Sequence, residues 1–472
     1  MKLCRLRFLQ LLALACARVP ALVLGADRKA PTEDVNLPLP AQVQKFIADK
    51  ERQVTTIAVK HKVELWPEVV NFFDVAKKGE WPVARDLYRD LRQSVDYGRG
   101  SKDEDHVAAT VQSAALEVEL ALEQFAEGEP KYAEAFGRDI VNSMPNGSVY
   151  FGGTDPGRGL PTAFCRSHAN ADPVFVLTQN ALANSYYVTY LRDMYGAKLY
   201  VPTEEETSAA FKDYVADAQR RLEHDENFPN EPRLIKPGED VRMRNNRVQV
   251  SGQVAVMSIN AQIAKLIFER NPGREFFIEE SFPLDWMYPH LSPHGLIMKI
   301  NRKPPAMLSE AVVKQDRKFW TDLQRNLIGD WPRMDTPVTN LCEVAETVFV
   351  EKDLDDFDGD AKFVRNLNAC RTYSKLRSSI GGMYAWRARE AKEPAERERM
   401  RKEADFAFRQ AFALYPGGGE AVFRYVNLLT GQKRFDEALR LVQTAVKIDP
   451  GAGNFNTLMD ELERMKKGGR AE

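Results

Sequence analysis

Near its C-terminus the chain repeats a pattern of small and proline residues with a period of 34 residues. Pro416 and Pro450 keep this spacing, and so do Ala404 and Ala438. A repeat of this length is one helical hairpin, in which small residues let two helices pack closely and the proline ends the second helix. Because one hairpin cannot bury its apolar face alone, the repeats must stack on each other and on preceding helices. The pattern predicts a helical C-terminal region over residues 381–472.

This register resembles the tetratricopeptide repeat. The sequence Arg434–Ala438, which follows Gly431, is typical of the turn and second helix of that repeat. The resemblance implies a concave helical surface that binds another protein or a peptide. Apolar residues at helical spacing predict further hairpins within residues 27–145, and these hairpins resemble degenerate copies of the same repeat. The first of them is expected to place three apolar side chains on one helical face, namely Trp66, Val70 and Phe73.

Between residues 146 and 304 the periodicity changes to short, apolar, β-rich segments that alternate with helical ones. Such segments predict strands buried on both faces, and the alternation with helices implies parallel pairing through right-handed crossovers. The predicted strands are residues 148–153, 172–178, 275–282 and 295–302. The fold class is therefore α/β, with a mostly parallel sheet, flanked by all-α tetratricopeptide-like hairpins. A helical connector is expected over residues 305–380.

A small hairpin is predicted inside the α/β region. Residues 241–250 alternate between apolar and polar side chains around an Asn-Asn turn. Ser251 follows directly, and a serine at this position favours a helix N-cap. We therefore expect a helix that starts after Ser251 and ends near Arg270.

Two stretches of the α/β region, residues 146–158 and 172–183, resemble the soluble portion of bacterial protein O-mannosyltransferase-like membrane proteins. In that family a strand ends in a Gly-Asp loop before a helix, and a second strand leads to an Asn-containing turn. Glu279–Phe282 and Gly295–Lys299 resemble the same region, which can likewise precede tetratricopeptide repeats. The sequence lacks the multispanning half that would hold the sugar-transfer chemistry. The resemblance therefore implies a fold and a compartment, and no enzyme activity.

A glycine-rich loop at residues 152–159 is the candidate ligand site, because open α/β sheets bind ligands where a strand leads into a helix. Glycines let backbone N–H groups approach an anion, Arg158 is suited to a phosphate or carboxylate, and Asp155 is suited to a hydroxyl group. The candidate residues of the loop are Gly152, Gly153, Thr154, Asp155 and Arg158.

The adjacent strand ends in Thr178, Gln179 and Asn180, whose side chains are expected to face the same crevice, and Gln179 and Asn180 complete the candidate site. A purely structural alternative stays open, in which Asp155 caps the helix and Pro156 occupies its first turn. The spacing matches neither a P-loop nor a dinucleotide-binding fingerprint, so no cofactor is assigned.

Neither a catalytic constellation nor a metal site is expected. His290 and His294 are four residues apart, but the neighbouring prolines preclude a helix and a third ligand is missing, so a turn between strands is expected. The acidic stretch 353–360 fails as a calcium loop at both its first and its last ligand position. Three aromatic residues could stack on a sugar but are assigned to the core, namely Phe282, Trp286 and Tyr288.

The N-terminus carries three basic residues and then an apolar run that starts at Phe8. This pattern predicts a signal peptide over residues 1–26 with cleavage before Asp27, and Ala15–Ala17 is a second possible site. A lipid anchor at Cys16 is disfavoured because the preceding residues match the usual Leu-led box poorly. The protein is therefore expected to be periplasmic or otherwise exported. The three later cysteines are expected to be buried thiols: Cys165, Cys342 and Cys370.

The charges nearly cancel, with 66 basic against 68 acidic residues, so nucleic acid is not an expected partner. After the signal peptide no stretch reaches the ~18 apolar residues of a membrane span. Two functional hypotheses remain. The first is a non-enzymatic scaffold that binds a protein or peptide through its helical repeats. The second is a small-ligand or glycan-binding α/β domain, with catalysis left open, that uses the loop at residues 152–159.

Overall fold

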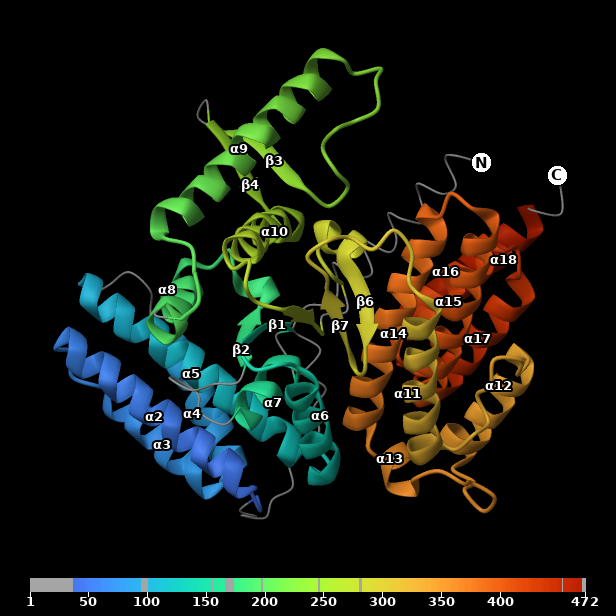
Figure 1. Ribbon diagram of the computed structural model, residues 1–472, viewed down its shortest axis with the longest axis horizontal. Coiled ribbons are helices and arrows are strands. Elements are labelled where there is room, and N and C mark those ends of the chain that lie inside the picture. The colour runs from blue at the N-terminus through green and yellow to red at the C-terminus, as the bar shows by residue number, and fades with distance from the viewer. Residues whose placement is uncertain are drawn as a thin grey trace. The chain divides into compact units, whose positions relative to one another are not determined.

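The computed structural model describes residues 37–94, 101–153, 156–165, 174–196, 198–244, 247–279, 282–451 and 453–468. These residues belong to two compact units that interleave along the chain. The first comprises Met1–Glu123 and Gly152–Arg274, and the second comprises Gln124–Phe151 and Glu275–Glu472. Helices dominate both units (Figure 1). The predicted signal peptide, its cleavage site at Asp27 and Cys16 lie outside the described residues.

The first unit holds the N-terminal helices and much of the predicted α/β region. Gly79 ends the second of these helices in the left-handed region, at φ 75°. The predicted apolar face of that helix is wrong by one position, because Val69 is buried beside Phe73 whereas Val70 is 44% exposed. The elements are α2 (Ala41–His61), α3 (Pro67–Lys78), α4 (Trp81–Ser94), most of α5 (Lys102–Ala126), α7 (Pro156–Phe164), β2 (Val174–Thr178), η1 (Gln179–Ala181), α8 (Ser185–Tyr195), α9 (Glu204–Asn227), β3 (Asp240–Arg244), β4 (Arg247–Ser251) and α10 (Gln253–Arg270).

The predicted small hairpin is confirmed. Strands β3 and β4 pair in antiparallel register, with Val241 opposite Val250. Ser251, however, does not cap the following helix. It ends β4 and donates a hydrogen bond to Asp240 at 2.6 Å, and Gly252 is the N-cap of α10. Gly252 has φ 88°, a conformation that strains residues with a Cβ, so the cap position falls to the glycine.

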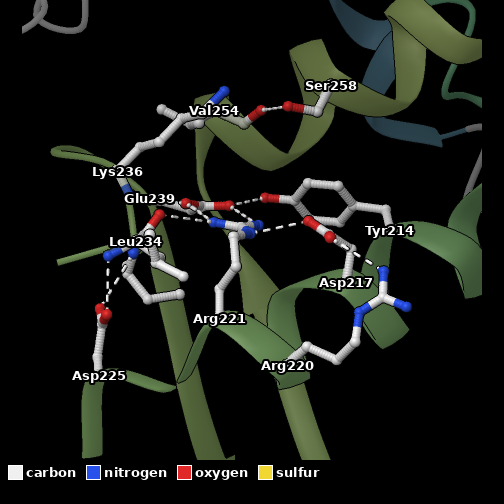
Figure 2. A network of polar contacts seen from close by, with 11 residues as sticks. Tyr214, Asp217, Arg220, Arg221, Asp225, Leu234, Lys236, Glu239, Val254 and Ser258 are labelled. Carbon is white, nitrogen blue, oxygen red and sulfur yellow. Dashed lines mark hydrogen bonds and ion pairs between the residues drawn. The ribbon is translucent and has the colours of Figure 1, made fainter. Parts of the chain in front are cut away.

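A network of hydrogen bonds and ion pairs joins residues 234–239, which precede this hairpin, to α9 (Figure 2). Arg221 of α9 donates to both carboxylate oxygens of Glu239, at 2.6 and 2.7 Å, and Tyr214 donates to the same carboxylate. Asp225 accepts hydrogen bonds from the backbone N–H groups of Leu234 and Ile235. Because α9 thus binds Leu234, Ile235 and, next to the hairpin, Glu239, α9 and the hairpin pack as one structural element.

The second unit contains a mixed sheet with the strand order β1-β5-β7-β6. Strands β1 (Ser148–Gly152, of which Gly152 falls in the first unit) and β5 (Phe276–Ile278) are parallel, and both are fully buried. Strand β7 (Ile297–Ile300) is antiparallel to β5 and to β6 (Leu291–His294). The α/β class is confirmed, with one parallel pair and two antiparallel pairs in this sheet. Strand β6 was not predicted, because Pro293 interrupts its pattern. A proline is tolerated there because β6 is an edge strand.

The rest of the second unit is helical. α15 and α17 end just before Pro416 and Pro450, where the 34-residue register predicts their ends. The boundary predicted between residues 380 and 381 falls inside α14. The elements are α6 (Pro130–Ser143), η2 (Asp285–His290), α11 (Glu310–Ile328), α12 (Val338–Glu346), η3 (Thr347–Glu351), α13 (Ala361–Arg365), α14 (Leu367–Glu390), α15 (Pro394–Leu414), α16 (Gly419–Gly431), α17 (Phe435–Ile448) and α18 (Gly453–Gly468).

A buried polar chain joins three of these helices. Arg377 of α14 is 1% exposed and donates to Asp316 of α11 at 2.9 Å and to Gln410 of α15 at 2.8 Å. Gln410 in turn donates to Gln324 of α11 at 2.8 Å. Since a buried charge is stable only when it is paired, these contacts fix how the three helices pack. The repeats are therefore built on α11, as the stacking argument predicts.

Candidate functional site

The glycine-rich loop begins in the buried interior. Gly152 ends β1, and Gly152 and Gly153 are both buried. Thr154 and Asp155 lie outside the described residues. Pro156 then opens α7, in the first-turn position that the structural alternative expects. Among the loop's polar candidates, only Arg158 has a side chain that the structure describes.

Arg158 lies in the first turn of α7 and is 2% exposed. Its Nε and Nη2 both donate to Oε1 of Glu117 in α5, at 3.0 and 2.8 Å. Its guanidinium carbon lies 4.7 Å from the centre of the Tyr187 ring, a cation–π distance. The sequence predicts that Arg158 binds a carboxylate, and Glu117 of the same chain fills this role for two of its nitrogens.

Glu117 also joins a second buried cation. Lys50 of α2 is fully buried, and its ammonium group forms a hydrogen-bonded ion pair with Oε2 of Glu117. Tyr190 of α8 donates to Oε2 of Glu117 at 2.8 Å and accepts a hydrogen bond from Lys50. One carboxylate thus connects four elements of the first unit: α2, α5, α7 and α8. We call Lys50, Glu117, Arg158 and Tyr190 the buried cluster.

Burial and charge shift the pKa values in this cluster. Burial disfavours the charged form of Arg158, but the Glu117 carboxylate outweighs it and raises the pKa of Arg158 above its ordinary value. Burial raises the pKa of Tyr190 well above its ordinary value, and the charge of Glu117 raises it further. Arg158 therefore stays cationic and Tyr190 stays neutral at any physiological pH.

Thr178 ends β2, and the residues after it form a short turn. The backbone N–H of Thr178 donates to the Tyr187 hydroxyl at 2.7 Å. Gln179 donates to the Asn180 side chain at 3.1 Å, and the Asn180 carbonyl accepts from Asn260 of α10 at 3.1 Å. The structure therefore pairs Arg158 with Glu117 and bonds Asn180 to α10, while Gln179 bonds to Asn180.

Sequence reasoning missed Lys50, Glu117 and Tyr190. Glu117 is 41 residues from Arg158 and 67 from Lys50, and no motif links positions so far apart. A signal was present in α5, where Glu117 interrupts the otherwise apolar stretch Ala114–Val118. A lone carboxylate on an apolar helical face needs a buried partner, and that requirement is the sequence clue.

The two histidines lie in different elements, since His290 ends η2 and His294 ends β6. His290 bonds to the carbonyl of Asn301 at 2.6 Å, and His294 bonds to the carbonyl of Ser143 at 2.8 Å. Within the described part of the chain, no group of three or more His, Cys, Asp or Glu side chains is arranged to hold a metal ion. In the acidic stretch, Asp360 caps α13 and binds Lys131 at 2.7 Å.

Of the remaining predictions, the one for the cysteines is confirmed and the one for the aromatic residue Phe282 is wrong. The three later cysteines are all buried, as predicted. Burial raises the pKa of Cys342 to about 11, which makes this thiol a poor nucleophile at neutral pH. The core assignment of Phe282 is wrong, because its side chain is 40% exposed. Phe282 instead covers the guanidinium of Arg424 in α16, 4.6 Å from its ring centre.

The helical repeats bury their small residues as the 34-residue register requires, with Ala404, Ala411, Ala438 and Ala445 all fully buried. Other parts of the unit cover two of the helices. Arg387 of α14 donates to the carbonyl of Leu291 in β6 at 2.7 Å. Glu346 of α12 accepts from Arg440 and Lys447 of α17, at 2.5 and 2.8 Å.

Helix α16 keeps four partly exposed side chains on the face beside Phe282: Glu420, Phe423, Arg424 and Asn427. We call these four residues the α16 face. It adjoins the last helix, since the Phe423 ring lies 6.1 Å from the ring of Phe455 in α18.

Comparison with known proteins identifies the repeats. The tetratricopeptide repeat family model matches residues 398–462, which run from α15 into α18. No curated protein and no solved structure matches the chain. The resemblance of residues 146–304 to O-mannosyltransferase-like proteins gains no support from these comparisons. The chain is thus an α/β protein that carries a tetratricopeptide repeat, a module that generally mediates contacts between proteins. Over the described residues, no helix has both the length and the apolarity needed to cross a membrane.

Proposed function

We propose that this protein is an exported, non-enzymatic scaffold that binds another protein or a peptide through the α16 face. The observation that carries the proposal is the tetratricopeptide repeat at residues 398–462. Stacked repeats of this kind offer extended surfaces to a partner chain. The N-terminal pattern of basic residues followed by an apolar run supports export.

The geometry of the second unit favours the α16 face as the contact surface. β6 contacts α14 and α12 contacts α17, whereas the α16 face keeps an aromatic ring and an amide partly exposed. Its two charged side chains pair with each other at 3.3 Å, and Glu420 is the more exposed of the two. Phe282 adds a 40% exposed ring at its edge. Aromatic and arginine side chains are the residues that contribute most to protein interfaces.

Site-specific photocrosslinking tests the proposal better than truncation, because the repeats share a core with α11. A photoreactive phenylalanine analogue replaces Asn427 on the α16 face, and a matched control carries the same analogue at exposed Lys402 of α15. We expect a discrete crosslinked adduct from position 427 in cells that make the protein natively, and none from position 402. Identical adducts at both positions, or none at position 427, would contradict the proposal.

Export has its own test. Cells that produce the full chain with a C-terminal tag are fractionated, and the N-terminus of the tagged product is determined. We expect the product outside the cytoplasm with Asp27 as its first residue. An unprocessed chain in the cytoplasmic fraction would contradict export and leave the crosslinking result unaffected.

A further inference from the structure

The first unit contains a pocket of about 530 Å³ that the proposed scaffold function does not use. It lies among α4, α5, the first turn of α7 and the start of α8. Its walls are largely aromatic and aliphatic, with Tyr88, Leu116, Tyr186 and Tyr187 among the lining side chains. A volume of roughly 300–1,000 Å³ and a mainly apolar lining with a few polar groups are typical of small-molecule sites.

Arg158 of the buried cluster forms part of this wall. Nε and Nη2 are both committed to Glu117, whereas Nη1 donates to no acceptor in the described part of the chain. Nη1 is not among the fully buried unpartnered nitrogens of the described residues, so this N–H remains accessible to a bound acceptor. A guanidinium donates to carboxylates through short, charge-assisted hydrogen bonds.

The electrostatic surroundings favour an anion. Among the residues that the structure describes, the charged side chains lining the pocket are Arg92, Arg158 and Glu119, two cations against one carboxylate. Arg158 lies in the first turn of α7, and Tyr186 and Tyr187 lie in the first turn of α8. Helix N-termini carry partial positive charge and unpaired N–H groups, which stabilise a nearby anion.

We propose that this pocket binds a small aryl carboxylate. The carboxylate accepts from Nη1 of Arg158, and the aromatic body lies against the tyrosine and leucine walls. The site is independent of the α16 face and of the protein-binding function.

Binding of 2-naphthoate by the full chain tests this inference, with 2-naphthamide as the uncharged probe of the same shape. Titration calorimetry measures both. We expect naphthoate to bind at least about tenfold more tightly than the amide, since hydrogen bonds to charged groups are the stronger ones. Equal affinities, or no naphthoate binding, would overturn the proposal.

Two substitutions test whether naphthoate binds in this pocket. Leu116→Trp fills it from α5 with Glu117 and Arg158 left in place, and Val59→Trp adds the same ring on α2 at a position that is 72% exposed and outside the pocket lining. We expect Leu116→Trp to abolish naphthoate binding, with a circular-dichroism melt like that of the unchanged protein, and Val59→Trp to retain it. Unchanged binding in Leu116→Trp would place the probe elsewhere and refute the site.

Discussion

At the scale of single residues, Glu117 is the carboxylate that joins four elements of the first unit. Replacing it by glutamine keeps the shape of the side chain but removes the negative charge that Lys50 and Arg158 contact in the buried cluster. Breaking a buried ion pair costs about 3–5 kcal/mol, so we expect Glu117→Gln to lower the free energy of unfolding by that order. Urea unfolding followed by tyrosine fluorescence and circular dichroism measures the change. The control is Glu119→Gln on the same helix, and an equal loss in both variants would contradict the assignment.

The buried cluster also shows what sequence reasoning could predict about the candidate site. Arg158 was found because it lies in a glycine-rich loop after a strand, a pattern that is local. Its partner Glu117 is on another helix, and the pairing depends on how α5 and α7 pack. Local patterns could therefore nominate the cation and its ligand class, but could not show that the chain supplies one such ligand itself.

At the scale of elements, Glu239 governs the attachment of the hairpin segment to α9. Burial opposes its ionisation, but hydrogen bonds from Arg221, Tyr214 and the Lys236 N–H prevail and lower its pKa from 4.5 to about 2. A depressed carboxyl pKa stabilises the fold fully above the unfolded value of 4.5, and this stabilisation is lost as pH falls towards 2. We expect backbone amides of residues 234–251 to lose hydrogen-exchange protection over that interval.

A pair of substitutions isolates this effect. Glu239→Gln removes one titrating group, so amide protection is expected to be lower at pH 7 and to fall less between pH 4.5 and 2 than in the unchanged protein. The remaining fall is expected from Asp225 and Asp240, whose pKa values are also lowered by hydrogen bonds within this segment. Glu226→Gln alters an exposed carboxylate of the same helix and is expected to behave like the unchanged protein. The assignment fails if protection in Glu239→Gln equals that of the unchanged protein at pH 7.

Helices and strands whose own residues show a clear pattern could be predicted from the sequence. Those that depend on where they lie in the fold could not. The α17 helix follows from its register of small residues, and the β3–β4 hairpin follows from its alternation. Strand β6 contains a proline, and only its place at the sheet edge makes that residue acceptable. Likewise Ser251 is a good helix cap by composition, but the sharp turn out of β4 requires the positive φ of Gly252.

At the scale of the whole molecule, the chain passes between its two compact units three times, so neither unit is a continuous segment. The 34-residue register marks the repeats as a C-terminal block, yet their core reaches outside that block. Arg377 on α14 and Gln324 on α11 both share hydrogen bonds with Gln410 of α15, and Arg377 also binds Asp316 of α11. The tetratricopeptide repeat is therefore a part of the second unit's core and not a removable appendage.

Truncation after residue 380 tests this dependence. The fragment 1–380 keeps Arg377 and Asp316 but loses α15, which covers them, so the second unit is expected to unfold because a charged pair and an apolar helix face become exposed. The first unit holds its own buried cluster and is expected to persist. Hydrogen exchange resolved by peptide should show lost protection in α11 and retained protection in α2, α8 and α10. Retained protection in α11 would show that the repeats are dispensable for the second unit, and collapse of α2 and α8 would show that the units fold as one.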